Sequence, residues 1–189
     1  MNLNVVFEQF PVLESGEIVL MKIEDSHLDA MYEIYSNSHV FHFCGIIPMR
    51  NKVSIAKMIG NFERDYNKRT KIKWGIFLKN SGESPIGIIE AFGFDQKINM
   101  VTIGYFLAEL HWGKGIAAKA VSAVVKYFFE EVGINRIQAE VMLLNERSKR
   151  VLMKNGFVHE GTIRQAALWT GKGIIDLDLF SILRADYSN

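Results

Sequence analysis

Hydrophobic residues along this chain follow two spacings, one typical of strands and one typical of helices. Strand-like runs of β-branched, aromatic and aliphatic residues occur at 17–23, 72–78, 85–92, 101–107, 136–143, 157–168 and 174–183. Apolar residues three and four positions apart, as on one face of a helix, occur at 28–35, 53–66, 116–131 and 146–154. The pattern therefore predicts about six or seven strands and about four helices in mixed order.

The order of these segments indicates how the strands pair. The runs 72–78, 85–92 and 101–107 follow one another closely, which favours an antiparallel meander. The first two are joined by Asn80-Ser81-Gly82-Glu83, which has the chemistry of a turn. A strand–helix–strand unit comes next, and two further strands close the chain. We therefore expect an α+β (mixed α/β) fold.

Length and composition favour a single domain. A chain of 189 residues, 49% of them hydrophobic, is long enough to bury roughly 70% of the surface that its unfolded form exposes. The sequence contains no repeat, low-complexity tract or long Pro/Gly/Ser linker. We therefore expect one domain over residues 1–189, with its core at about 15–185.

Charge and cysteine content narrow the class of protein. A net charge of +1 argues against a nucleic-acid surface and gives no reason to expect an anionic membrane as partner. No apolar stretch reaches 18 residues, and the acidic N-terminal region lacks the pattern of a signal peptide. The single cysteine, Cys44, excludes an internal disulfide and suits a reducing compartment. We expect a cytoplasmic protein in which Cys44 is a small buried residue.

The run His111–Ala118 joins a predicted strand to a predicted helix. Gly113 and Gly115 would let the backbone approach a ligand closely. The helix that follows would offer unpaired N–H groups and the positive end of its dipole, as at many phosphate-binding sites. The sequence therefore predicts a phosphate-bearing ligand at residues 112–118.

Other interpretations of this glycine run are weaker. Gly113-x-Gly115-x-x-Ala118, with Glu140 further on, satisfies the dinucleotide fingerprint. That turn belongs after the first strand of its fold, however, whereas four or five elements precede it here. The residues after it are too few for a second nucleotide-binding half. A P-loop is excluded because Gly-Lys-Ser/Thr does not occur. A connection that binds no ligand is the remaining alternative.

A second motif, later in the chain, helps to interpret the glycine run. The segment from Asn145 to Phe157 has the spacing Asn-x-x-Ser, followed by a helix that ends in Gly-Phe. Together with Trp112-Gly113-Lys114-Gly115-Ile116-Ala117, it resembles the Gcn5-related N-acetyltransferase (GNAT) superfamily, in its ribosomal-protein N-terminal acetyltransferase (Rim-type) branch. The resemblance begins near residue 15 and continues through Glu160–Arg164 and Gly171–Leu183. It implies a mostly antiparallel twisted sheet, splayed at the cofactor site and flanked by helices.

The resemblance also implies a reaction and its ligands. It implies acetyl-coenzyme A as co-substrate, a primary amine as acceptor, and no metal. The backbone of Phe106 and Leu107 would bond the pantetheine amides, and Asn145 would contact coenzyme A. The pyrophosphate would be held by Trp112, Gly113, Lys114, Gly115, Ile116, Ala117 and Ala118. Trp112 stands where the strict motif has a polar residue.

Direct transfer needs a neutral amine, a polarised carbonyl and a proton for the departing thiolate. The resemblance makes Ser148 the candidate proton donor; the alternative is a first-turn hydroxyl that bonds the helix backbone. Glu90 interrupts a hydrophobic strand and is the candidate base, unless it faces solvent or pairs with a cation. Many relatives carry an acid where this chain has Thr102. His42 and His111 are weaker candidates for the base.

The sequence leaves the acceptor open among a protein N-terminus, a polyamine or other small amine, and an amino-sugar or drug. A non-catalytic acyl-coenzyme A-binding or sensing module is the alternative, because Thr102 replaces the usual acid. A dinucleotide-binding oxidoreductase is a third possibility. His39, His42 and Cys44 on one loop are too few to predict a metal site. Strand hydrophobics near the C-terminus would serve either a homodimer or the core.

Overall fold

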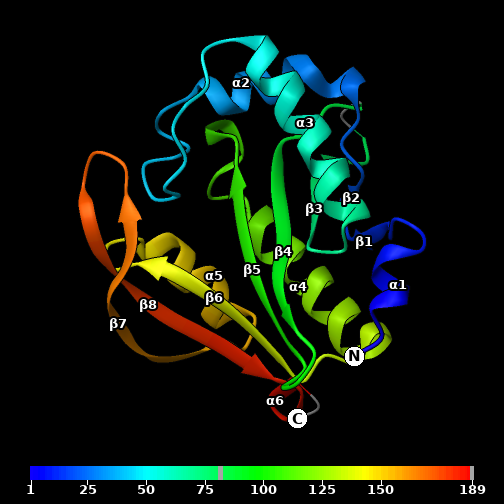
Figure 1. The fold of residues 1–189 in the computed structure, drawn as a ribbon, viewed down its shortest axis with the longest axis vertical. Coiled ribbons are helices and arrows are strands. Elements are labelled where there is room, and N and C mark those ends of the chain that lie inside the picture. The colour runs from blue at the N-terminus through cyan, green and yellow to red at the C-terminus, as the bar shows by residue number, and fades with distance from the viewer. Residues whose placement is uncertain (81–82, 188–189) are drawn as a thin grey trace.

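A mixed sheet with helices on both faces organises the chain (Figure 1). The structure is a computed structural model and describes residues 1–80 and 83–187. Within these residues the sheet has eight strands in the order β1-β2-β3-β4-β5-β6-β8-β7. β5 and β6 run parallel, and the other neighbouring pairs are antiparallel. The predicted α+β class is confirmed.

The elements have the following bounds. The strands are β1 (Leu13–Ser15), β2 (Ile18–Met21), β3 (Lys71–Leu78), β4 (Gly87–Asp95), β5 (Met100–Leu107), β6 (Arg136–Met142), β7 (Val158–Trp169) and β8 (Gly173–Leu183). The α-helices are α1 (Leu3–Phe7), α2 (Leu28–Ser36), α3 (Lys52–Asn67), α4 (Ile116–Tyr127), α5 (Glu146–Lys154) and α6 (Arg184–Tyr187). Short turns of other helix types are η1 (Asp25–His27), η2 (Glu109–His111) and the π-helical η3 (Phe128–Val132).

Most predicted elements are present with small shifts at their ends. The antiparallel meander is confirmed as β3, β4 and β5. The first predicted strand, 17–23, is shorter and spans Ile18–Met21. The predicted helix 116–131 is α-helical as far as Tyr127 and then widens into the π-helical η3, which ends at Gly133 in the left-handed conformation. The predicted turn at 80–83 includes Ser81 and Gly82, which lie outside the described residues.

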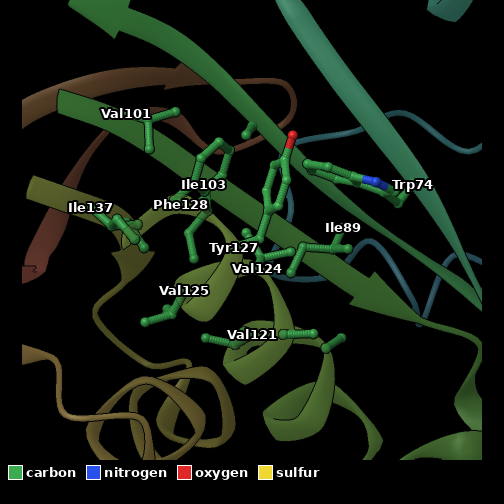
Figure 2. Packing of buried hydrophobic residues seen from close by; sticks show 14 of the residues in the cluster. Trp74, Ile89, Val101, Ile103, Val121, Val124, Val125, Tyr127, Phe128 and Ile137 are labelled. Carbon is green, nitrogen blue, oxygen red and sulfur yellow. The ribbon is translucent and has the colours of Figure 1, made fainter. Parts of the chain in front are cut away.

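One face of the sheet is covered by α4, whose apolar residues recur at helical spacing (Figure 2). The packed side chains from α4 and η3 include Val121, Val124, Val125, Tyr127 and Phe128, and those from the sheet include Trp74, Ile89, Val101, Ile103 and Ile137. Each large side chain buried in this way contributes about 1.5–3 kcal/mol. This cluster fixes where α4 begins relative to the end of β5.

The other face of the sheet is covered by α2 and α3, which lie over its first half (Figure 1). Ile88 of β4 and Phe106 of β5 point into this second apolar cluster. The loop between α2 and α3 adds Phe41, whose ring lies 5.1 Å from that of Phe106. The tip of the β7–β8 hairpin reaches the loop between α2 and α3, where Lys172 donates to the His42 carbonyl. Two faces of β5 therefore meet different surroundings, with α4 and α5 on one side and α2 and its loop on the other.

Candidate active site

The sheet opens between its two parallel strands. In the described part of β5 and β6, pairing is confined to Met100 with Arg136, Val101 with Ile137, and Thr102 with Gln138. Beyond these pairs the strands diverge, and Figure 1 shows the resulting V between β5 and β6. β5 stays paired with β4 as far as Leu107. The second half of β5 therefore presents one backbone edge to the opening, as the resemblance implied.

Backbone alternation decides which groups on β5 face this opening. Ala108 donates its N–H to the Ile86 carbonyl, and the Phe106 carbonyl lies close to Gly87 of β4. Because successive residues of a strand direct their backbone groups to opposite sides, Tyr105 and Leu107 face the opening. The Leu107 carbonyl already accepts a hydrogen bond of 2.9 Å from Trp112 Nε1. The pantetheine contacts of Phe106 and Leu107 stay predictions; Leu107 turns its backbone groups to the opening, whereas Phe106 turns its carbonyl to β4, and Tyr105 joins them as a candidate.

The glycine run forms the connection from β5 to α4. Gly113 and Gly115 have φ values of +74° and +77°, in the left-handed region that favours glycine. Apart from adjoining parts of the chain, no described heavy atom lies within 4 Å of where a Cβ would stand on either residue. Among the described residues, no side chain caps the start of α4, so its first N–H groups point outward without a side-chain acceptor. This arrangement fits the phosphate-bearing ligand that the sequence predicts.

Trp112 anchors this connection. Its indole bonds the Leu107 carbonyl and packs against the apolar clusters on both faces of the sheet. The Arg147 guanidinium lies over the indole, 5.2 Å from the ring centroid, and so links the glycine run to α5. Burial, together with the charge of Lys114, lowers the pKa of His111. An aromatic residue suits the position of Trp112 because its role here is to hold the loop.

Ser148 lies in the first turn of α5, beside the opening. Asn145 caps this helix, and its Oδ1 accepts the Ser148 N–H at 3.1 Å. The Ser148 hydroxyl lies 2.9 Å from the Tyr105 hydroxyl, which also donates to the Ser148 carbonyl at 3.2 Å. Asn145 thus has a structural role as a cap, and its contact with coenzyme A stays a prediction. Sequence reasoning missed Tyr105, because tyrosine is common in strands and by itself does not indicate a functional site.

Glu90 lies on the opposite face of the sheet. It is paired with Lys73 of β3 in the register, and Lys73 Nζ lies 2.7 Å from its Oε2, with Lys71 Nζ at 3.5 Å. Its other neighbour is Gly104 of β5, where an added Cβ would stand 3.5 Å from Glu90 Oε1. The Glu90 side chain is 22% exposed. The carboxylate is therefore a cation-paired group on β4, one strand away from the opening.

Burial and the Glu90 charge act on two neighbours of this carboxylate. Burial, and secondly the charge of Glu90, raises the pKa of the Cys44 thiol to about 11. The same two causes, with burial the larger, raise the pKa of Tyr35. Both groups therefore stay protonated at neutral pH. Cys44 is half-buried and unpaired with another cysteine, so its surroundings are those of a shielded thiol and not of an activated nucleophile.

Thr102 is buried in a polar network and leaves the usual acid position neutral. Its Oγ1 accepts a hydrogen bond of 3.3 Å from Gln138 Nε2. Gln138 in turn accepts from Arg136, which forms a two-bond ion pair with Glu160 at 2.7 and 2.6 Å. Thr102 therefore connects β5 to β6 just before the two strands diverge, and this contact helps define where the opening starts.

His39, considered only as a metal ligand, and His42, a weaker candidate for the base, lie on the loop between α2 and α3. His39 Nδ1 lies 3.4 Å from a carboxylate oxygen of Glu109. His42 is exposed, and its carbonyl accepts from Lys172 Nζ at 3.2 Å, which joins the α2–α3 loop to the β7–β8 hairpin. Within the described residues, no cluster of three or more His, Cys, Asp or Glu is arranged to hold a metal ion. None of the described helices is both long and apolar enough to span a membrane.

Comparison with known proteins identifies the family. Residues 17–158 match the family described as Acetyltransferase (GNAT) domain. The chain is 34% identical over 175 residues to the uncharacterized N-acetyltransferase YoaA of Bacillus subtilis (strain 168), covering 93% of this chain and 98% of that protein. It is 31% identical over 81 residues to the ribosomal-protein-serine acetyltransferase of Escherichia coli (strain K12), covering 43% of this chain and 45% of that one.

Comparison of folds agrees. The structure of Mycobacterium smegmatis RimJ in complex with CoA-disulfide superimposes with a TM-score of 0.83, covers 95% of this chain and 88% of that chain, and is 21% identical in sequence. That likeness concerns the fold, whereas the family match spans most of the chain. The chain therefore belongs to the GNAT family, and it is an N-acetyltransferase.

Proposed function

We propose that this enzyme transfers an acetyl group directly from acetyl-coenzyme A to a primary amine. The observation that carries the proposal is the opening between β5 and β6, which ends at the glycine run. On the face with α5, the opening is bordered by the Ser148 hydroxyl. On the other face it is approached by the Glu90 carboxylate, across Gly104. Donor and acceptor would thus reach the same gap from opposite faces.

The residues would divide the work as follows. N–H groups at the start of α4, with Gly113 and Gly115, bind the pyrophosphate, and the edge of β5 bonds the pantetheine amides. The amine nitrogen attacks the thioester carbon, forming a C–N bond, and its surplus proton passes to Glu90, directly or through water. The C–S bond then breaks, and Ser148 donates to the sulfur that leaves with the bonding electrons.

The acceptor is a primary amine on a protein N-terminus or on a small molecule such as a polyamine. The Escherichia coli relative supports the first class, because it is a ribosomal-protein acetyltransferase by name. The small-molecule class is supported by the half-buried setting of Glu90, a carboxylate that leaves room for a compact amine. A non-catalytic acyl-coenzyme A-binding module is the alternative, and it would bind the donor without releasing thiol.

Thermal unfolding with and without acetyl-coenzyme A tests the proposal, with NADH and ATP as controls. A donor present at about 100 times its Kd should add roughly 2.7 kcal/mol of stability. A Tm rise with acetyl-coenzyme A alone is the expected result, followed by thiol release with peptides bearing a free N-terminus or with spermidine. A rise with NADH instead would refute the proposed donor site. Binding without thiol release from any amine would favour the non-catalytic alternative.

Glu90 is tested by substitution with Gln, which keeps the shape and removes the charge. We expect Glu90→Gln to lower kcat by about 100-fold, in the range of general base catalysis, while acetyl-coenzyme A affinity stays within about twofold. Lys71→Gln is a matched control because it removes the more distant of the two cations beside Glu90. Wild-type kcat in Glu90→Gln would exclude this carboxylate as the base.

A further inference from the structure

Tyr105 and Ser148 form a hydroxyl pair across the opening. Tyr105 comes from the diverging half of β5 and Ser148 from the first turn of α5, and their oxygens lie 2.9 Å apart. Both residues are half-buried. The Ser148 backbone is held separately by the Asn145 cap. The serine is therefore fixed at its N–H by Asn145 and at its hydroxyl by Tyr105.

The two hydroxyl groups can form either of two hydrogen-bonding patterns. The Tyr105 hydroxyl has one proton and two acceptors within reach, the Ser148 carbonyl at 3.2 Å and the Ser148 Oγ at 2.9 Å. When Tyr105 donates its hydrogen bond to the Ser148 carbonyl, the Tyr105 oxygen accepts a hydrogen bond from the Ser148 hydroxyl. When Tyr105 donates to Oγ instead, the serine proton is released to point elsewhere. Rotation of the Tyr105 hydroxyl hydrogen thus decides whether the Ser148 hydroxyl donates to Tyr105 or is free to donate to another group.

Electrostatics suits the second arrangement. A serine hydroxyl is a weak acid, and negative charge that develops on Oγ needs a donor beside it. Burial raises the pKa of Tyr105, an effect that the hydrogen bond to Ser148 only partly offsets, so the phenol keeps its proton over the whole working pH range. Tyr105 is therefore suited to donate a hydrogen bond and unsuited to act as a base.

We propose that Tyr105 is a positioning residue for the departing thiolate. Its hydroxyl orients the Ser148 hydroxyl toward the sulfur and strengthens it as a donor. When the C–S bond breaks, the sulfur takes the bonding electrons and is stabilised by Ser148, while Tyr105 retains its own proton. The sulfur thus leaves as a thiolate; its later protonation takes one proton from solvent, in balance with the amine proton that Glu90 accepts and returns to solvent. This inference rests on the proposed function, because it assumes acetyl-coenzyme A in the opening.

The test measures the bound thiol and needs no acceptor. Coenzyme A labelled with 13C at the carbon next to sulfur is titrated by NMR in complex with the protein, and the chemical shift reports ionisation of the thiol. In the wild type we expect the thiol to ionise about one pH unit lower than in Tyr105→Phe, a tenfold difference in thiolate population. Ser148→Ala should raise the pH at which the bound thiol ionises by the same amount. The double variant should raise it no further than Ser148→Ala alone.

A matched control separates this role from a structural one. Tyr127 also donates its hydroxyl to a backbone carbonyl, that of Val5 at 3.0 Å, but lies in the core of α4. Tyr127→Phe should lower Tm and leave the bound thiol unchanged. With an amine that releases thiol, Tyr105→Phe should lower kcat about tenfold, less than a general acid contributes, with KM for acetyl-coenzyme A within about twofold.

Each adverse outcome has a distinct meaning. If Tyr105→Phe ionises the bound thiol at the wild-type pH while Ser148→Ala does not, Ser148 acts without Tyr105 and the inference is wrong. The inference is also wrong if Tyr105→Phe still lowers kcat in a protein that already carries Ser148→Ala. If the wild type leaves the labelled coenzyme A with the shift and titration of the free molecule, the proposed donor site fails, and the inference fails with it.

Discussion

The surroundings of Glu90 show what a single position in the sequence can and cannot predict. An acid inside the hydrophobic run Ile88–Phe92 is visible in the sequence and marks the residue as unusual. The neighbours that decide its role, Lys73 and Gly104, come from other strands and depend on sheet register. A one-residue slip would turn each of these side chains to the other face. Register is set by the whole sheet, so sequence reasoning left the base undecided between two interpretations.

Tyr105 was missed for a related reason. The motif Asn145-x-x-Ser148 is visible along the chain because the two residues share one helix turn. The partner of Ser148 lies more than 40 residues earlier, at a separation of 43. Contacts of this kind follow from the packing of α5 against β5 and have no local pattern. Residues that touch a ligand through a motif are therefore easier to predict than residues that position them.

At the same scale, Glu160 should give the protein an acid-sensitive component of stability. Hydrogen bonds from Arg136 and Ser181 lower its pKa from 4.5 to about 2. Because the folded-state pKa is the lower one, the stabilisation is present above about pH 4.5 and is lost as the pH falls toward 2. We expect Glu160→Gln to lower Tm by roughly 3 °C at pH 7 and to have little effect at pH 2.

Thermal unfolding of wild type and Glu160→Gln across this pH range checks the prediction. Glu14, which pairs with Lys79 at the surface, provides a control, since its carboxylate is 64% exposed and such pairs contribute little. A constant Tm difference between wild type and Glu160→Gln from pH 7 to pH 2 would contradict the assignment.

The helices and strands differ in how well they can be predicted from the sequence. α3, α4 and α5 are long enough to show a helical period, and α3 and α4 begin within one residue of the predicted position. α1 has five residues and β1 has three, and segments this short have no measurable period. The π-helical η3 was also unforeseen, because it keeps the apolar spacing of α4 while changing only the backbone bonds. Short length therefore hid α1 and β1, and an unchanged apolar spacing hid η3.

The start of α4 makes a prediction about an element as a whole. Gly115 is its N-cap residue at φ +77°, so Gly115→Ala forces an L-residue into a left-handed conformation at a cost of about 1–2 kcal/mol. A methyl group there would also occupy the space offered to phosphate. We expect Gly115→Ala to weaken acetyl-coenzyme A binding by about tenfold or more, which calorimetry measures.

Gly171 supplies the matched control. It lies in the turn between β7 and β8 at φ +80°, with no described heavy atom within 4 Å of an added Cβ. Gly171→Ala should therefore lose a similar amount of stability and leave acetyl-coenzyme A affinity at the wild-type value. Equal affinities in the two variants would show that the glycine run is a strained turn without a ligand.

At the scale of the whole molecule, the N-terminal segment joins α3, α4 and the sheet. Tyr66 and Tyr127 donate to the carbonyls of Val6 and Val5, and Trp74 Nε1 donates to the Pro11 carbonyl at 2.8 Å. Trp74 and Tyr127 are buried in the core, and Tyr66 is half-buried against it. The core estimated from the sequence began near residue 15, but buried residues occur as early as Val6.

Phe7 should be the most sensitive position in this segment. Its ring is 7% exposed and lies 5.3 Å from that of Tyr66 and 5.5 Å from that of Phe94. We expect Phe7→Ala to cost about 3–5 kcal/mol and to lower Tm by roughly 10 °C. Val5→Ala on the exposed side of the same helix should have little effect. A Phe7→Ala protein as stable as wild type would show that the segment is dispensable.

The homodimer stays a prediction at this scale. Leu168 and Ile174 of the β7–β8 hairpin are 81% and 63% exposed, so these two residues do not complete the core. β7, which carries Leu168, is an edge strand of the sheet, and β8, which carries Ile174, is its neighbour.

The divergence of β5 and β6 has a consequence for the protein between reactions. It creates edge strands in the interior of a sheet, where hydrogen-bonding groups have no strand partner, and such edges invite pairing with other chains. A donor bound there through its amides would complete the sheet as an added strand does. Catalysis and self-protection then depend on the same bonds. We therefore expect aggregation and proteolysis to be fastest when the donor is scarce, because the gap would then stay open.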